Sequence, residues 1–125
     1  MPTYFNRSRH VNRTPESEFR DACLKWLKLR FGPKMFHERN HQSMGSTPGR
    51  PDDQFLFKSL DRPDPIPVYI EFKSPTGRIG PRQLAYHEAL RAMGARVYVV
   101  RTFDELEEAV ADFQPSQLRM REVQK

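Results

Sequence analysis

The sequence predicts a single α/β domain with the element order α-β-β-β-α-β-α. Three observations lead to this fold class. Apolar residues recur with helical spacing in three segments. Four other short segments show the alternation of apolar and polar residues, or the continuous apolar run, that is typical of strands. The last strand, helix and strand follow one another closely, which is typical of a right-handed parallel crossover. We therefore expect a mixed four-stranded sheet flanked by helices.

A first helix is expected to begin at Pro15, with Thr14 as its N-cap, because threonine favours the cap and proline the first helical position. Gly32-Pro33 should end it. Its apolar stripe at helical spacing comprises Phe19, Ala22, Cys23, Trp26 and Leu27.

Three strands are expected next, within residues 34–42, 52–57 and 68–73. A turn-rich loop (43–51) separates the first two, and a polar, proline-rich connection (58–67) separates the second from the third. Alternation in the third strand places Val68, Ile70 and Phe72 on one face and Tyr69, Glu71 and Lys73 on the other.

A second helix should run from Pro81 to about Met93, where Gly94 ends it. Its expected inner stripe is Tyr86, Ala89, Leu90 and Met93, with Gln83 one turn earlier. The segment 95–101, ARVYVVR, predicts the last strand. Thr102 and Glu105 then form a capping box for a final helix. That helix should turn Leu106, Ala109, Val110 and Phe113 inward.

The predicted domain covers residues 14–113 of the 125, between a basic flexible arm (1–13) and a basic tail (114–125). No apolar run approaches the length of a membrane span, and the N-terminus lacks the apolar segment of a secretory signal. The single cysteine, Cys23, excludes an internal disulfide framework and fits a reducing cytoplasm. Its place on the helical stripe predicts a core residue.

The charge balance favours a polyanionic partner. The formal net charge is +5, and the basic excess is concentrated at the N-terminus and in residues 77–101. Neutralising phosphates with basic side chains releases counterions and favours nucleic-acid binding. Many small basic domains nevertheless bind no nucleic acid, so charge alone leaves both interpretations open.

Two neighbouring segments suggest a metal site. GRPDD places Asp52 at the start of one strand, and IEFK places Glu71 and Lys73 on one face of the next. If these strands pair, two carboxylates meet, and both stay ionised only with a cation between them. Carboxylate oxygens suit Mg²⁺ or Mn²⁺. The alternative is a surface salt bridge between Glu71 and Lys73, worth under about 1 kcal/mol.

The series GRPDD…IEFKSPTGRIGPRQLAYHEALRAMGARVYVVRTFDEL resembles the PD-(D/E)xK nuclease superfamily, and within it the VRR-NUC branch, known from phage stand-alone nucleases and from a eukaryotic DNA-repair nuclease. The resemblance covers residues 14–113 and implies a restriction-endonuclease-like core. It also implies that Asp52, Glu71 and the backbone carbonyl of Phe72 bind Mg²⁺ or Mn²⁺. Lys73 would be the catalytic lysine, with Gln83 supporting the site from its helix.

The resemblance further implies a glutamate from the first helix. Glu16 and Glu18 both qualify by position; Glu16 lies nearer the apolar stripe and is the candidate metal ligand. Asp53 departs from the family's pattern, which more often has an apolar or basic residue there. By alternation it should point away from Asp52, as a neighbour of the site and not a ligand.

Several residues are candidates for contact with DNA. Gly77 and Gly80 let the loop SPTGRIGPRQ approach phosphate, and Arg78 and Arg82 add charge beside a helix N-terminus. The alternative is a linker with solvated arginines. Further candidate DNA contacts are Arg50, Arg39 and His41.

Three histidines, His37, His41 and His87, and Tyr86 have weaker signals. His37 and His41 are four apart, but the strand-like pattern there disfavours a zinc site. His87 is expected to be either a packed or a solvent-facing histidine. Tyr86 is expected either to pack beneath Gln83 or to be an ordinary aromatic residue of the core.

The resulting hypothesis is a Mg²⁺- or Mn²⁺-dependent DNA nuclease without a small-molecule cofactor. The resemblance implies selectivity for branched, flap or junction DNA, a homodimer, and a bacterial or phage-infected cytoplasm. A non-catalytic DNA-binding module on the same fold and a restriction-type endonuclease are the alternatives. Endonuclease and exonuclease modes stay open.

Overall fold

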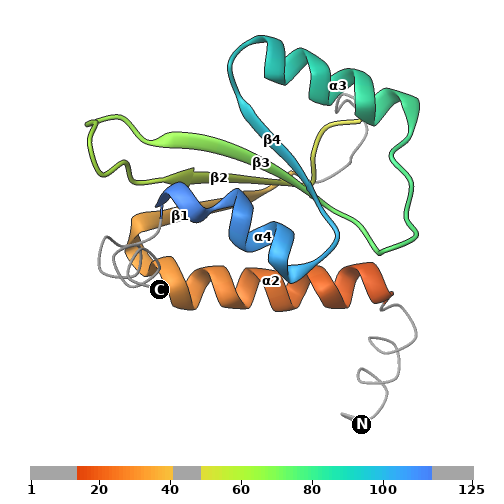
Figure 1. Ribbon diagram of the computed structural model, residues 1–125, viewed down its shortest axis with the longest axis horizontal. Helices are drawn as coiled ribbons and strands as arrows, with labels where there is room; N and C mark the ends of the chain where they lie inside the picture. The colour runs from red at the N-terminus through yellow and green to blue at the C-terminus, as the bar shows by residue number, and fades with distance from the viewer. Residues whose placement is uncertain (1–13, 41–48, 114–125) are drawn as a thin grey trace, which may run out of the picture.

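A four-stranded mixed sheet forms the middle of the molecule in a computed structural model that describes residues 14–40 and 49–113 (Figure 1). Its strands are β1 (Met35–Arg39), β2 (Asp53–Phe57), β3 (Ile66–Phe72) and β4 (Arg96–Val100), in the order β1-β2-β3-β4. β2 pairs antiparallel with β1 and β3, and β3 pairs parallel with β4. The predicted mixed sheet is confirmed. The predicted arm, tail and His41 lie outside the described residues.

Helices lie on both faces of this sheet (Figure 1). The helix α2 (Pro15–Phe31) and the short helix α4 (Phe103–Ala109) pack on one face, and α3 (Pro81–Ala92) on the other. Two 3-10 turns complete the order: η1 (Gly32–Lys34) after α2 and η2 (Ala111–Phe113) after α4. Within the described residues, no helix combines the length and the apolar character needed to cross a membrane.

Two of the predicted helix starts have capping boxes. At α2, the backbone N–H of Ser17 donates to Thr14 Oγ1 at 3.1 Å, and the N–H of Thr14 donates to Ser17 Oγ at 3.0 Å. At α4, the N–H of Glu105 donates to Thr102 Oγ1 at 3.2 Å, and the N–H of Thr102 donates to Glu105 Oε1 at 3.0 Å. Reciprocal bonds of this kind satisfy backbone donors that lack partners in the first helical turn.

The apolar core fills the space between the sheet and the α2/α4 layer. Val68, Ile70 and Phe72 of β3 are all fully buried there, as the alternation predicted. Rings from distant segments pack together: Phe57 stacks on Phe113 with centroids 4.6 Å apart. The other fully or nearly fully buried members are Cys23, Leu27, Phe31, Phe55, Val100, Leu106, Ala109 and Val110. The predicted inward residues of the last helix are therefore confirmed.

The inner face of α2 differs from the predicted stripe. Ala22 is exposed, and Phe19 and Trp26 are only half-buried, whereas Arg20 is buried. The buried line runs through Arg20 and Cys23 because a buried carboxylate of the sheet, Asp53, lies beneath the guanidinium. An arginine on the buried side of a helix is not expected from hydrophobic spacing.

The predicted inner stripe of α3 is largely wrong. Ala89 is exposed and Met93 is 86% exposed, while Tyr86 and Leu90 are half-buried. The side chain that α3 buries is His87, at 1% exposure. The reason lies in the sheet face that α3 covers: beside Val97 and Val99 of β4, this face presents the carboxylate of Glu71, which His87 faces.

The third strand is also longer at its start than predicted. It begins at Ile66 and includes Pro67, and it ends at Phe72, so that Lys73 lies just beyond it. Pairing with β4 begins only at Val68, so Pro67 lies where one side of β3 is unpaired. A residue without a backbone N–H is tolerated in such a place.

Candidate active site

The register of β2 against β3 brings Asp52 and Glu71 to the same end of the sheet. Asp53 pairs with Ile70, so Asp52, one residue earlier, lies across from Glu71, one residue later. In an antiparallel pair these two positions share a face. The carboxyl group of Asp52 acts on Glu71 through its charge and through a side-chain hydrogen bond. The expected convergence of two carboxylates is therefore present.

Glu71 is an unusually placed acid. It is 1% exposed, and its Oε1 atom has no hydrogen-bond partner among the described residues. Burial, followed by the charge and the hydrogen bond of Asp52, raises the pKa of Glu71 to about 8. A carboxyl group in this position takes up a proton at neutral pH unless a cation compensates its charge.

Lys73 and Glu16 complete the charged surroundings of Glu71. The positive charge of Lys73 lowers the pKa of Glu71 in part, and the negative charge of Glu16 raises it. The backbone N–H of Lys73 donates to the carbonyl of Val100 at 3.0 Å, which extends the β3–β4 pairing by one residue and fixes the start of the lysine side chain. Of the two candidate glutamates, Glu16 is half-buried and acts on Glu71, whereas Glu18 is exposed.

Asp53 lies on the opposite face of the sheet, as its alternation with Asp52 predicted. Arg20 donates from Nε to Asp53 Oδ2 at 2.8 Å and from Nη2 to Oδ1 at 2.6 Å. His37 Nε2 lies 2.6 Å from the same Oδ1. Burial by itself would raise the pKa of Asp53, but the hydrogen bonds from His37 and Arg20 outweigh it and hold this pKa below its usual value. Asp53 is thus an ionised structural carboxylate beside the site.

The loop before Asp52 is held by two contacts that sequence reasoning missed. The backbone N–H of Asn40 donates to the carbonyl of Asp52 at 2.7 Å, and its Nδ2 donates to the carbonyl of Pro51 at 3.0 Å. Gly49 has φ +88° and lies against the first turn of α3, where an added Cβ would come within 2.6 Å of the Arg82 carbonyl carbon. Asn40 and the glycine of GRPDD therefore place Asp52 between β1 and α3.

The loop after Lys73 is braced from β4. Arg101 Nη1 donates to the carbonyl of Ser74 at 2.9 Å and also to the carbonyl of Gly77. The guanidinium was expected only as part of a basic cluster, but it organises the turn through backbone carbonyls. Arg78 and Arg82, the predicted phosphate contacts in this loop, are both exposed.

Gln83 and Tyr86 sit on α3 near this loop. Gln83 Oε1 accepts a hydrogen bond from the N–H of Gly80 at 2.9 Å, so its side chain caps the start of the helix. Tyr86 is half-buried. The structure thus gives Gln83 a local role in forming the loop-to-helix junction beside the carboxylates.

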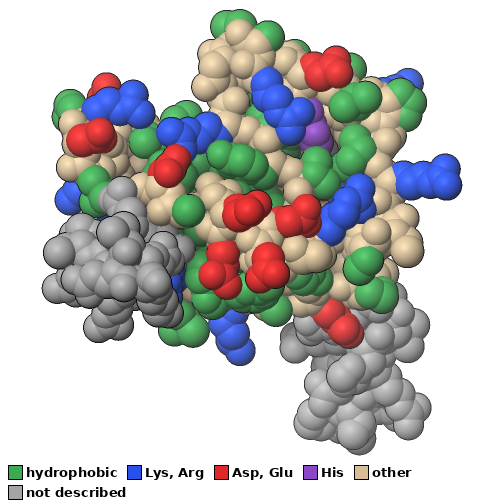
Figure 2. All heavy atoms as spheres, viewed as in Figure 1, with side chains coloured by type: hydrophobic (Ala, Val, Ile, Leu, Met, Phe, Trp, Pro, Cys, Tyr) green, Lys and Arg blue, Asp and Glu red, His purple; other side chains and the backbone are tan. Residues whose placement is uncertain are grey.

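The remaining predicted DNA contacts are distributed unevenly. Arg39 is exposed at the end of β1, where its Cα pairs with that of Asp53, and Arg50 is half-buried two residues before Asp52. Figure 2 shows acidic side chains gathered over α4, which contributes Asp104, Glu105, Glu107 and Glu108. This acidic region disfavours approach of a polyanion to that part of the surface.

Few side chains in the described part of the chain are placed so that they could bind a metal ion together. Within residues 14–40 and 49–113, no three His, Cys, Asp or Glu side chains are grouped so as to hold a metal ion. A cation at the carboxylates would therefore have Asp52 and Glu71 as its side-chain ligands, with backbone or solvent oxygens for the rest. His37, bound to Asp53, offers no support for a zinc site.

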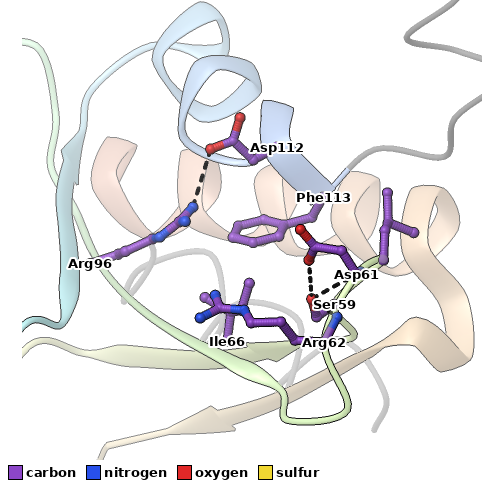
Figure 3. Close-up of a pocket in the computed structure, with 8 residues that line it drawn as sticks. Ser59, Asp61, Arg62, Ile66, Arg96, Asp112 and Phe113 are labelled. Carbon is purple, nitrogen blue, oxygen red and sulfur yellow. Dashed lines mark hydrogen bonds and ion pairs between the residues drawn. The ribbon is translucent and has the colours of Figure 1, made fainter.

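A cavity of about 380 Å³ lies at the other end of the strands (Figure 3). Arg96 lines it, but Arg96 Nη1 is paired with Asp112 Oδ2 at 3.3 Å and its guanidinium lies 5.1 Å from the ring centroid of Phe113. Ser59 Oγ donates to Asp61 on the opposite wall. The charges of this cavity are balanced internally, so it does not compete with the carboxylate end as a site of chemistry.

Solved structures share this fold. One described as "VRR_NUC domain" superimposes with a TM-score of 0.56 at 24% identity, covering 74% of this chain and 95% of that chain. Another, described as "VRR_NUC domain protein", gives a TM-score of 0.59 at 17% identity, covering 80% of this chain and 88% of that chain. No family model and no curated protein sequence matches the chain. The chain has the fold of a VRR-NUC domain.

Proposed function

We propose that this protein is a Mg²⁺- or Mn²⁺-dependent nuclease that hydrolyses phosphodiester bonds in DNA. The observation behind the proposal is the pair of carboxyl groups at the end of β2 and β3. Glu71 is buried beside Asp52, its pKa is raised to about 8, and its Oε1 has no partner among the described residues. The fold shared with structures described as VRR-NUC domains supports the same function.

A divalent cation fits this pair chemically. Asp52 and Glu71 supply hard carboxylate oxygens, and the backbone carbonyl of Phe72 would add a third oxygen. Glu16, whose charge already acts on Glu71, would complete the acidic surroundings from α2. When bound, the cation supplies Lewis acidity toward the scissile phosphate.

The other residues of the site would act on water and phosphate. Lys73 lies on the same face as Glu71, so its ammonium would orient the attacking water or stabilise charge on the phosphorane, or its neutral amine would accept a proton from that water. Gln83 would hold the loop-to-helix junction through Gly80.

The exposed Arg78 and Arg82, beside the N-terminus of α3, would bind flanking phosphates. Arg50, Arg39 and His41 would extend this contact.

The proposed substrate is branched, flap or junction DNA, and the proposed active form is a homodimer in a bacterial or phage-infected cytoplasm. The physical argument is size, because a domain of residues 14–113 has little surface with which to grip a duplex alone. Two copies would present two sites to a branched substrate.

The test is cleavage of labelled duplex, single-stranded, flap and four-way-junction DNA with Mg²⁺, Mn²⁺ or EDTA. We expect metal-dependent cleavage by the wild type and its loss in Asp52→Asn and Lys73→Ala. Matched controls are Asp64→Asn and Lys58→Ala, which change exposed residues at the other end of the sheet and should leave cleavage intact. Cleavage that survives in Lys73→Ala would refute the assigned role of that lysine.

A second candidate is a non-catalytic DNA-binding module on the same fold. One observation favours it: within the described part of the chain, no three metal-ligating side chains are clustered together. Salt-dependent binding of every DNA substrate without cleavage of any would establish it in place of the nuclease.

A further inference from the structure

His87 and Glu71 face each other across the interface between α3 and the sheet. Both side chains are 1% exposed. His87 Nε2 lies 4.0 Å from Glu71 Oε1, and neither atom has a hydrogen-bond partner within the described residues. Two unpaired buried polar atoms that face each other are rare in folded proteins, since buried polar groups are nearly always bonded.

The chemistry of the two groups is complementary. A carboxylate oxygen accepts hydrogen bonds, and a neutral imidazole donates from one ring nitrogen. The gap of 4.0 Å exceeds a normal N–H···O distance by about 1 Å, so a small approach of α3 to the sheet would pair both atoms at once. The charged groups that act on His87 are Arg91 on its own helix and Lys73 beyond β3.

The position of His87 in α3 also argues against a packing role alone. It is the residue that α3 buries, while the neighbouring apolar residues Leu84 and Met93 are 49% and 86% exposed. A leucine at position 87 could fill similar space but would leave Oε1 of Glu71 permanently without a donor. The helix thus directs its one buried side chain at a carboxylate.

We propose that His87 is a positioning residue, whose Nε2–H holds Oε1 of Glu71 so that the other carboxylate oxygen faces Asp52 and a divalent cation. The inference rests on the proposed function for its cation. Residues that hydrogen-bond to a metal-binding side chain fix the orientation of that side chain and strengthen metal binding. In this arrangement α3 contributes to the site from a residue that need not touch DNA.

The test uses the full chain and Mn²⁺ itself as the probe, with binding measured by isothermal titration calorimetry. We expect His87→Leu to weaken Mn²⁺ binding by about 10- to 100-fold. His87→Gln keeps a side-chain N–H donor and should recover most of that affinity. Leu90→Ala is the matched control: it removes a half-buried apolar side chain from α3, so it should lower the thermal unfolding midpoint without changing Mn²⁺ affinity.

The outcomes separate the two proposals. Wild-type affinity in His87→Leu, or equal loss in His87→Leu and His87→Gln at similar thermal stability, would overturn the positioning role. A wild-type protein that binds Mn²⁺ but cuts no DNA would overturn the nuclease alone and leave the His87 result standing. A wild-type protein that binds no Mn²⁺ would overturn both.

Discussion

Arg20 and Asp53 form a buried two-point ion pair that joins α2 to the first residue of β2. The guanidinium donates at 2.8 and 2.6 Å, and the Asp53 side chain is fully buried. Asp52, the proposed metal ligand, is the residue immediately before Asp53. The pair therefore ties the helix to the strand end at which the proposed chemistry takes place, and it sets the sheet face on which each aspartate lies.

Removing one partner of this pair should destabilise the fold. Asp53→Ala leaves Arg20 buried without its carboxylate, which costs about 3–5 kcal/mol when a buried pair is broken on one side. Equilibrium unfolding in urea measures this loss in the free energy of unfolding. The control is Asp112→Ala, which breaks the exposed Arg96–Asp112 pair of 3.3 Å and should cost under about 1 kcal/mol. Similar losses in the two variants would contradict the structural role of the buried pair.

Glu71 should make the metal-free protein less stable as pH rises. Its pKa in the folded protein is about 8, above the ordinary value of about 4.3 in an unfolded chain. Between these values the folded state keeps a proton that the unfolded state has released, so the free energy of unfolding falls with increasing pH. We expect the thermal midpoint in EDTA to decline from about pH 5 to about pH 8.

The variant Glu71→Gln supplies the comparison for this pH effect. The variant cannot ionise at position 71, so its thermal midpoint should decline less over the same pH range. The difference between its midpoint and that of the wild type should be largest at the alkaline end. Saturating Mn²⁺ should likewise raise the wild-type midpoint most at high pH, since the cation binds the ionised carboxylates. Parallel pH curves for wild type and Glu71→Gln in EDTA would show that burial of Glu71 has no such consequence.

Two glycines with similar backbone angles should respond differently to alanine. Gly49 and Gly94 have φ of +88° and +92°, but only Gly49 has backbone atoms in the path of a new Cβ. Gly94→Ala should cost about 1 kcal/mol from backbone strain alone. Gly49→Ala adds a clash with Arg82 and should cost more, or shift the loop that precedes Asp52.

Urea unfolding of the two alanine variants measures the stability difference, and Mn²⁺ affinity reports on the loop. We expect weakened Mn²⁺ binding in Gly49→Ala but not in Gly94→Ala, whose position has nothing within 4 Å. Equal stability and unchanged Mn²⁺ affinity in both would mean that the packing of residue 49 on α3 does not place Asp52.

Arg101 should matter through the loop that follows Lys73. Arg101→Ala removes the donor to the carbonyls of Ser74 and Gly77, and each lost bond to a charged donor costs about 1.5–3 kcal/mol or frees the loop locally. Amide hydrogen exchange across residues 74–80 measures this directly. We expect faster exchange there in Arg101→Ala, with less change in Arg101→Lys. The exposed Arg62→Ala is a charge-matched control that should leave this loop unchanged.

The order of the elements and the meeting of Asp52 with Glu71 follow from the amino-acid sequence alone. These depend on local chemistry: caps at Thr14 and Thr102, alternation in β3, and the pairing of two adjacent strands whose register a short connection limits. The opposite orientation of Asp53 followed from the same two-residue period. The prediction failed where one face of a helix was assumed to be apolar, as at Ala22 and Met93.

The pairs of polar residues that are buried together depend instead on the packing of the folded domain. Arg20 and Asp53 are 33 residues apart, and Arg101 reaches a carbonyl 27 residues away. His87 faces Glu71 across the interface between α3 and the sheet, although no sequence pattern links the two positions. No periodicity marks such pairs, because a buried charge or imidazole is favourable only with its partner in place, and that partner is brought close by the packing of the whole domain.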